Sequence, residues 1–408
     1  MMGALEIDTP LPVGGGSSPN ASSSSLGSSS TSTTTRQSRP ACKTICYICI
    51  LFLICILSIS RFSLEIDTNT HQKGIIRAKL DNEFQSLPIR PLMELFESRQ
   101  VYFKLPEKTT PKGIFIYLHS CKQSGLEFFH LPEDRIIAYD ALKRDLAVVA
   151  PTSQNRESGC WGQADLAWVG KSINEWAQKH NLSQLPRIGM AESSAGSFLF
   201  FAHDKFDLKS MAVYHTPQGF DKEDIQKDLT IPTAFVTMPA DEPIYKRMEQ
   251  NYEALKEADV ATQLFKVAPH PYTERVCRDR MPEAKDHCRK FFRLVRKEHS
   301  SLMDVDGFIK EDLKTGKWKP LFDQLHLGDE RSRAAVNAFF TPQTQTGKSW
   351  LQAGIEQEIS ACQAYHSMTS ESHAAVLDFL VKEARIGKQP AKVSAGADEE
   401  EGGRQQRR

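Results

Sequence analysis

The chain has 408 residues, and its 51 Lys and Arg residues balance its 51 Asp and Glu residues, so the formal net charge is zero. A balanced charge offers no general attraction for phosphates, and we therefore expect no nucleic-acid partner. The part between the two polar ends, roughly 315 residues, is long enough for one large domain with an insertion.

The two ends differ from the middle in composition. Residues 1–43 consist largely of Ser, Thr, Gly and Pro, and residues 388–408 are dominated by charged and polar residues. Such segments bury too little apolar surface to offset chain entropy, so both are predicted to be disordered tails. Residues 61–99 are rich in charge and are predicted to form a linker or stem.

Residues 44–60, from Thr44 to Ser60, contain no charged residue. A helix of this length spans roughly 25 Å, which is the short end for a membrane helix and suits a thinner bilayer. A long polar segment precedes the run and no small-residue cleavage site follows it, which argues against a cleaved signal peptide. We therefore predict a transmembrane signal anchor, with the membrane as a partner.

Two features favour a luminal position for the large domain, in the endoplasmic reticulum or Golgi. Asn181 begins a glycosylation sequon, and Cys277 and Cys288 could pair in an oxidising compartment. The basic residues flanking the predicted span are too evenly divided to decide the orientation.

Short apolar runs alternate with helical segments along the middle of the chain. The runs predicted as strands are residues 100–105, 112–118, 146–150, a run that begins at Leu185, and residues 210–214, 231–237 and 262–267. Alternating strands and helices predict a mostly parallel sheet that is covered by helices on both faces. Reactive groups in such sheets gather at the carboxyl ends of the strands.

A strand, a sharp turn and a helix surround Ser193, which is the pattern of a nucleophile elbow. The turn requires small residues two positions before and after the nucleophile. Ala191 and Ala195 meet this requirement for Ser193, whereas Glu192 stands two positions before Ser194. The usual motif has glycine at both positions, and alanine resists positive φ. An ordinary helix start with a serine cap is the alternative interpretation.

Four passages together resemble the α/β-hydrolases, in particular esterases related to feruloyl esterases and polyhydroxybutyrate depolymerases. They are the strand that ends in His119-Ser-Cys, the helix from Asp165, the elbow, and the segment from Pro232 to Asp241. The sequence around His366 is also similar to a poorly characterised family of eukaryotic, notably plant, membrane-anchored proteins. The resemblance implies an α/β-hydrolase core.

The predicted core comprises residues 100–275. A helical insertion, residues 276–350, precedes the last helix and is expected to act as a lid or docking module. Residues 351–387 are expected to supply the catalytic histidine loop and the terminal helix.

A serine hydroxyl needs a histidine base that is oriented by a carboxylate, and in this fold the acid and then the histidine follow the serine along the chain. The resemblance implies Asp241 as the acid, with Glu242 as the fallback. His366 is preferred as the base because it lies thirteen residues before Phe379 in the terminal helix, which is the spacing that the resemblance implies. His270, directly after the last strand, is the alternative base. A third histidine, His373, is expected on the surface.

The developing oxyanion needs two backbone N–H donors. Ser194 is expected to supply one, and Cys121 or Ser120 the other. His119 is expected to shape this loop, and Trp161 to be a buried anchor.

No cofactor or metal is predicted. Residues 304–309 imitate a calcium loop, but leucines, Leu302 and Leu313, occupy its first and last ligand positions. Zinc and phosphate-binding motifs are also lacking from the sequence.

The preferred function is a membrane-anchored serine hydrolase that cleaves a small-molecule or polymer carboxylic ester through an acyl-enzyme. The alternative is a catalytically inactive α/β-hydrolase-like protein that serves as a binding or scaffold module.

Overall fold

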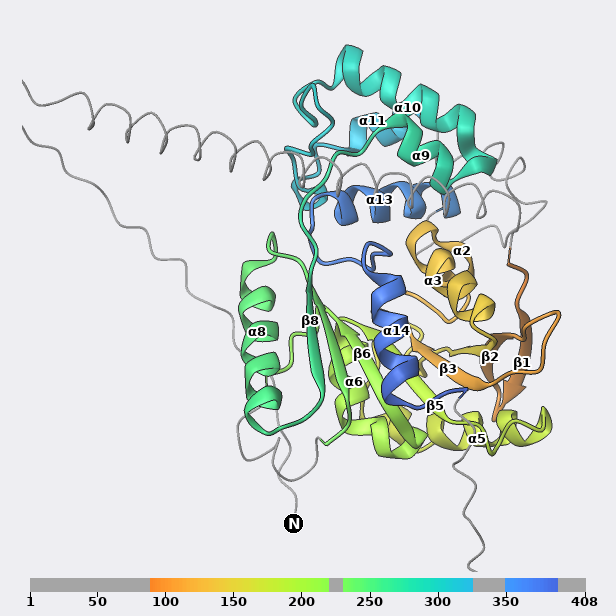
Figure 1. The fold of residues 1–408 in the computed structure, drawn as a ribbon. Coiled ribbons are helices and arrows are strands. Elements are labelled where there is room, and N and C mark those ends of the chain that lie inside the picture. The colour runs from red at the N-terminus through yellow and green to blue at the C-terminus, as the bar shows by residue number, and fades with distance from the viewer. Residues whose placement is uncertain (1–88, 220–229, 326–348, 388–408) are drawn as a thin grey trace, which may run out of the picture. The chain divides into compact units, whose positions relative to one another are not determined.

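The computed structural model describes residues 89–219, 230–325 and 349–387. The predicted tails, the predicted membrane span and the middle of the insertion lie outside these residues. The described strands are β1 (Leu92–Phe96), β2 (Arg99–Lys104), β3 (Gly113–Leu118), β4 (Leu146–Pro151), β5 (Arg187–Glu192), β6 (Leu208–Tyr214), β7 (Thr233–Thr237) and β8 (Thr262–Lys266) (Figure 1).

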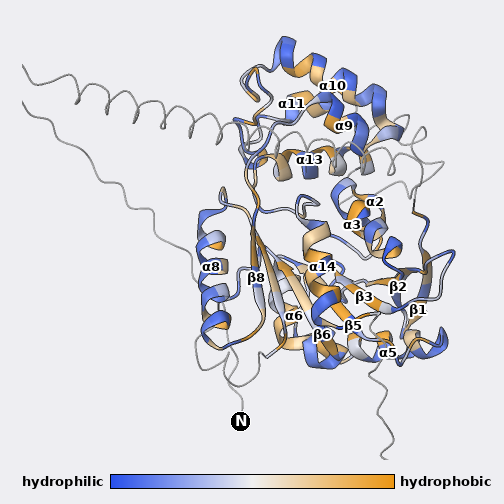
Figure 2. Cartoon of the chain, viewed as in Figure 1, coloured by the Kyte–Doolittle hydropathy of each residue, from blue (hydrophilic) through white to orange (hydrophobic). Residues whose placement is uncertain are grey.

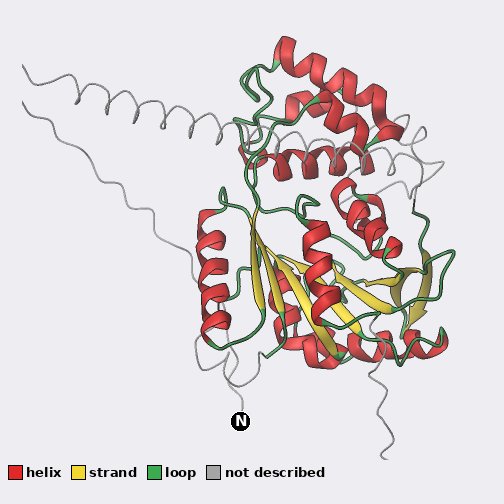
Figure 3. Ribbon diagram, viewed as in Figure 1, coloured by secondary structure: helices red, strands yellow, loops and turns green. Residues whose placement is uncertain are grey.

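The helices fall into two groups. Those that accompany the sheet are α2 (Glu127–His130), α3 (Pro132–Lys143), α4 (Gln163–Leu166), α5 (Val169–Lys179), α6 (Ser194–Ala202), α8 (Glu242–Glu257) and α14 (His373–Glu383). Those between β8 and the last helix are α9 (Glu274–Arg280), α10 (Lys285–Glu298), α11 (Lys319–Gln324) and α13 (Trp350–Cys362). Figure 3 shows the first group flanking the strands.

The eight strands form one sheet in the order β1-β2-β4-β3-β5-β6-β7-β8. The pairs β1–β2 and β2–β4 are antiparallel, and the remaining five pairs are parallel. The chain moves outward from β3 to β4 and then returns past β3 to β5. Ligands bind at such a reversal, beyond the carboxyl ends of the strands. The loops after β3 and β5 therefore frame the expected site.

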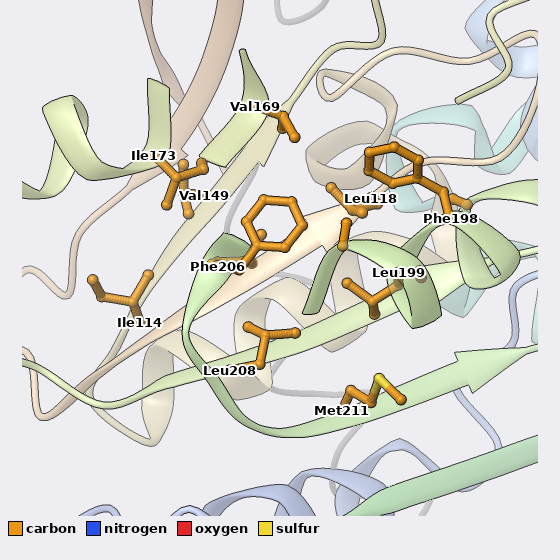
Figure 4. Packing of buried hydrophobic residues seen from close by; sticks show 14 of the residues in the cluster. Ile114, Leu118, Val149, Val169, Ile173, Phe198, Leu199, Phe206, Leu208 and Met211 are labelled. Atoms are coloured by element: carbon orange, nitrogen blue, oxygen red, sulfur yellow. The ribbon is translucent and has the colours of Figure 1, made fainter. Parts of the chain in front are cut away.

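Side chains of the central strands alternate between two apolar layers. On one face, Ile114, Ile116 and Leu118 of β3 join a buried cluster with α5, α6 and α8; Figure 4 shows ten labelled members of this cluster. On the other face, Phe115 and Tyr117 pack in a cluster with α3 and α14. Burial on both faces explains why these strands read as continuous apolar runs.

The helices between β8 and α14 have a core of their own. Its buried members include Phe291 and Phe292 of α10, Leu321 of α11 and Ile355 of α13. A disulfide joins Cys277 to Cys288 within this group, and so pairs the cysteines singled out in the sequence. Figure 2 shows that α10 is largely hydrophilic on the side in view, as expected of a helix with one buried stripe.

The prediction of a transmembrane helix as part of the fold requires correction. In the three described ranges no helix combines the length and apolar character that a membrane crossing requires. The longest of these helices, α8, has 16 residues, whereas a span needs about 20. The stretch from Thr44 to Ser60 lies outside the described residues. The fold class is therefore restated as α/β with a mostly parallel sheet.

Two local elements also differ from expectation. Strand β1 lies in residues predicted as linker, and it pairs only with β2 at the edge of the sheet. The helix expected from Asp165 is divided into α4 and α5, because the buried Asp165 carboxylate accepts hydrogen bonds from the N–H groups of Gly162 and Gln154 and from the Trp168 indole. These bonds fix a turn in place of a continuous helix.

Candidate active site

Ser193 occupies a sharp turn between β5 and α6. Its backbone has φ 56° and ψ −126°, a conformation that a non-glycine residue adopts only when its surroundings enforce it. The Ser193 N–H donates a hydrogen bond of 2.8 Å to the carbonyl of Tyr214 at the end of β6. Ala191 and Ala195 are fully buried beside the turn. The positive φ therefore falls on the serine, and neither alanine has to adopt it.

Gly196 satisfies a different steric requirement from the glycines of the usual elbow motif. A Cβ atom at this position would lie 2.9 Å from Thr216 Cβ, which is closer than packed carbon atoms approach. The glycine therefore lets α6 pack closely against the segment that follows β6.

The three residues chosen from the sequence as nucleophile, acid and base lie together at the carboxyl edge of the sheet. His366 Nε2 is 2.8 Å from Ser193 Oγ, and His366 Nδ1 is 2.8 Å from Asp241 Oδ2. Because the carboxylate accepts from Nδ1, the other ring nitrogen is left to accept the serine proton. The side chain of His366 is 24% exposed and that of Asp241 is 11% exposed, so the imidazole can meet a substrate while the acid is shielded.

The loops that hold these residues are joined by the backbone. Asp241 lies in the short loop between β7 and α8, and His366 lies between α13 and α14. The Ala240 N–H donates a hydrogen bond of 3.2 Å to the carbonyl of Ala364. This bond holds the acid loop against the histidine loop, although more than a hundred residues separate them in the chain.

The other titratable candidates have different partners. His270 Nε2 lies 3.3 Å from Glu371 Oε1, and Glu242, which is exposed, pairs with Lys246 at 2.6 Å. The expectation that His373 lies on the surface was wrong. This residue is only 6% exposed, because it is the first residue of α14 and lies on the side of that helix that faces α3. Its Nδ1 bonds to the backbone carbonyl of Ser370.

A further histidine, His215, was not predicted. It is fully buried, and its ring centroid lies 5.8 Å from that of His366. Burial, together with the neighbouring His366, lowers the pKa of His215 to about 3. His366 therefore has a neutral ring beside it, and an imidazolium formed there meets no opposing cation from this neighbour.

Three backbone amides are available near the nucleophile. Among the described residues, none accepts a hydrogen bond from the backbone N–H of Ser120, Cys121 or Ser194. Ser194 opens α6, where the first N–H groups have no partner within the helix. Leu118 at the end of β3 pairs with Ala191 of β5, which brings the β3 loop beside the elbow. The predicted donors thus occupy adjoining loops.

His119 and Trp161 hold the β3 loop from beneath. His119 is buried, its Nε2 accepts from the Ser153 N–H at 3.0 Å, and its Nδ1 bonds to the carbonyl of Ser120 at 2.8 Å. The Trp161 indole donates to the carbonyl of His119 at 2.9 Å. Burial lowers the pKa of His119 to about 4, so this imidazole is a neutral structural bridge at physiological pH.

Buried acids lie on the core side of the elbow. Burial raises the pKa of Glu192 to about 8 and that of Asp134 to about 7. The hydroxyl of Tyr117 and the amide of Gln357 both donate to the carboxyl group of Asp134. Glu192 precedes the nucleophile directly, and in its protonated form it adds no negative charge next to Ser193 in the chain.

One cavity of about 410 Å³ lies in the insertion, away from the candidate triad. It is lined by α10, by the loop after α10 and by residues ahead of α9, among them Phe292, Met303 and Tyr272. Within the described part of the chain no three His, Cys, Asp or Glu side chains are grouped so as to hold a metal ion.

The arrangement as a whole is that of an α/β-hydrolase, with an elbow between a parallel strand and the following helix; the resemblance identified in the sequence is confirmed at the level of the fold. Neither a family model nor a curated protein matches the chain.

Solved structures similar to this chain include three esterases or related hydrolases. An arylesterase is 16% identical, with a TM-score of 0.34, over 48% of this chain and 83% of the arylesterase. A dienelactone hydrolase from Anabaena variabilis is 14% identical, with a TM-score of 0.34, over 45% of this chain and 88% of the hydrolase. A Pyrococcus furiosus esterase is 10% identical, with a TM-score of 0.37, over 45% of this chain and 83% of the esterase.

Proposed function

We propose that this protein is a serine hydrolase that cleaves carboxylic esters through an acyl-enzyme. The observation that supports this most strongly is the continuous pair of 2.8 Å hydrogen bonds from Ser193 Oγ to His366 and from His366 to Asp241. A lone serine hydroxyl is a poor nucleophile at neutral pH, and this chain of bonds is what makes it reactive.

The proposed reaction has two halves. In the first, Ser193 Oγ attacks the ester carbonyl while His366 Nε2 accepts the hydroxyl proton, and then returns it to the departing alcohol as the ester C–O bond breaks. In the second, a water molecule attacks the acyl-serine, with His366 again transferring the proton, and the carboxylic acid is released. Asp241 stabilises the imidazolium in both halves, and the N–H groups of Ser194 and Cys121 bind the oxyanion.

The structure weakens the arguments for the alternative function, an inactive binding module. It rested on the alanines at both elbow positions and on the long separation of the histidine from the strands. Ser193 nevertheless has the strained elbow conformation, and His366 reaches it at hydrogen-bond distance. We therefore favour a catalytic function.

Labelling with a fluorophosphonate tests the proposal, because an activated serine displaces fluoride from this probe and becomes phosphonylated. Wild-type protein should become labelled, Ser193→Ala should not, and Ser194→Ala should still be labelled because it keeps both the nucleophile and the backbone N–H. Melting curves of all three proteins would establish that the variants are folded. Labelling that persists in Ser193→Ala and disappears in Ser194→Ala would show that Ser194 is the nucleophile. A folded wild type that is not labelled would contradict the proposed hydrolase activity.

We further propose that the domain folds in an oxidising compartment of the secretory pathway. Two disulfides, Cys121–Cys160 and Cys277–Cys288, support this, since such bonds are rare in reducing compartments. Asn181 of the sequon is exposed directly after α5. A mobility shift on deglycosylation, absent from Asn181→Gln, would test this; a reduced, unglycosylated protein from native tissue would contradict it.

A further inference from the structure

A disulfide connects two loops beside the candidate nucleophile. Cys121 lies in the loop after β3, and Cys160 lies in the loop after β4. The same two loops share a backbone hydrogen bond of 2.8 Å from the Lys122 N–H to the carbonyl of Ser158. Cys121 is therefore tied to the neighbouring loop both by its side chain and by the residue that follows it.

The disulfide also contacts the elbow. Ser194 Oγ lies 2.9 Å from Cys121 Sγ, and because a disulfide sulfur carries no proton, the hydroxyl is the donor. Ser194 and Cys121 are the two residues whose N–H groups are proposed above to bind the oxyanion. One sulfur atom thus links the two halves of the proposed oxyanion hole.

The backbone next to Cys121 needs such support. Lys122 has φ 62°, in the left-handed region that is unfavourable for a non-glycine residue. A strained residue keeps this conformation only while its surroundings hold it there. Loss of the tie allows the turn to relax, and relaxation at Lys122 rotates the peptide units beside it.

We propose that the Cys121–Cys160 disulfide is a positioning element of the oxyanion hole, and that its reduction slows hydrolysis by displacing the Cys121 N–H. The inference rests on the proposed hydrolase activity. Reduction by a dithiol transfers two electrons and two protons to the disulfide. The products are two cysteine thiols and the cyclic disulfide of the reductant. The triad itself is untouched by this step.

The two disulfides differ in access. Cys121 and Cys160 are both partly exposed, whereas Cys277 and Cys288 are completely buried. A thiolate must reach a sulfur atom in order to attack it. A dithiol acting on the folded protein should therefore reduce Cys121–Cys160 first.

The experiment compares the full chain in three forms with a short p-nitrophenyl ester as substrate: oxidised wild type, Cys121→Ser/Cys160→Ser, and the control Cys277→Ser/Cys288→Ser. The first double variant should lose about tenfold to hundredfold in kcat, somewhat less than the loss of a whole oxyanion donor, with KM changed by less than about threefold. The control should keep its kcat. Wild type treated with dithiothreitol should move to the rate of the first double variant.

A trifluoromethyl ketone separates positioning from general damage. It adds to the serine and places an oxyanion in the hole, so its affinity should fall by about the same factor as kcat. Fluorophosphonate should still label Ser193 completely, although more slowly, because the triad is intact. The variant should remain folded, since the Trp161 indole still bonds to His119 and packs on Phe198 with centroids 5.3 Å apart.

Distinct results overturn distinct statements. If the oxidised wild type neither hydrolyses esters nor becomes labelled, the proposed function fails and this inference fails with it. If the wild type is active, the positioning role is overturned by a kcat within about threefold of wild type in Cys121→Ser/Cys160→Ser. An equal loss in the control variant, or a fall in kcat with unchanged ketone affinity, would overturn it too.

Discussion

Replacing Asp241 by asparagine tests whether the carboxylate sets the protonation state of the base. Asp241 Oδ2 accepts from His366 Nδ1 at 2.8 Å, which leaves Nε2 free to accept the proton of Ser193. An asparagine amide can donate to Nδ1 instead. The ring proton then moves to Nε2, the nitrogen that has to receive the serine proton.

In an enzyme with the same arrangement this change lowers kcat by about 10⁴, equivalent to about 5.4 kcal/mol at 1.36 kcal/mol per tenfold. The side chain of His366 is 24% exposed, so water can restore the productive ring form in part of the population. We therefore expect Asp241→Asn to lower kcat by about 10³ to 10⁴, with KM nearly unchanged.

The assay is steady-state hydrolysis of a p-nitrophenyl ester, and Glu242→Gln is the matched control. Glu242 is adjacent in the chain, but its carboxylate pairs with Lys246 and is 69% exposed, so its loss should change kcat by less than about threefold. A larger effect of Glu242→Gln than of Asp241→Asn would refute the assignment of the acid. So would an Asp241→Asn variant that retains more than about a tenth of the wild-type kcat.

Three further predictions concern neighbouring residues. His366→Gln should abolish ester hydrolysis while His270→Gln keeps most of it, and the reverse order would make His270 the base. The pKa of Glu192 is raised to about 8, so the folded protein holds a proton that the unfolded chain releases from about pH 4.5 upward. The free energy of unfolding should therefore fall between about pH 4.5 and 8, by at most about 1.4 kcal/mol per pH unit for one proton; Glu192→Gln should flatten this slope in urea titrations, and an unchanged slope would contradict the shift. Gly196→Ala should destabilise the protein by about 1–3 kcal/mol, because the new Cβ meets Thr216 at 2.9 Å; an unaltered melting temperature would show that the helix yields without strain.

Features that depend on short-range sterics or on continuous burial could be predicted from the sequence. The small residues on either side of Ser193 indicated the turn, and the central strands could be recognised because both of their faces are buried. The resemblance implied Asp241 as the acid, and the spacing to Phe379 favoured His366 over His270 as the base. The structure places His366 within hydrogen-bond distance of both Asp241 and Ser193.

Features that depend on three-dimensional neighbours could not be predicted. Strand β1 has exposed apolar side chains, Leu92 and Leu95 among them, and its pairing with β2 alone leaves no run of buried residues to detect. Cys121 pairs with Cys160 because the loops after β3 and β4 lie next to each other in space, and the sequence spacing of the two cysteines does not indicate this. His215 could not be recognised as a site residue, because only the folded structure places its ring beside that of His366.

The route by which the base reaches the site limits how far this protein can be shortened. Ser193 and Asp241 follow strands of the sheet, whereas His366 comes a few residues after α13, a helix whose apolar residues share a core with α10 and α11. A trimmed version that joins β8 directly to α14 would keep the nucleophile and the acid but would remove His366 together with the helix that leads to it.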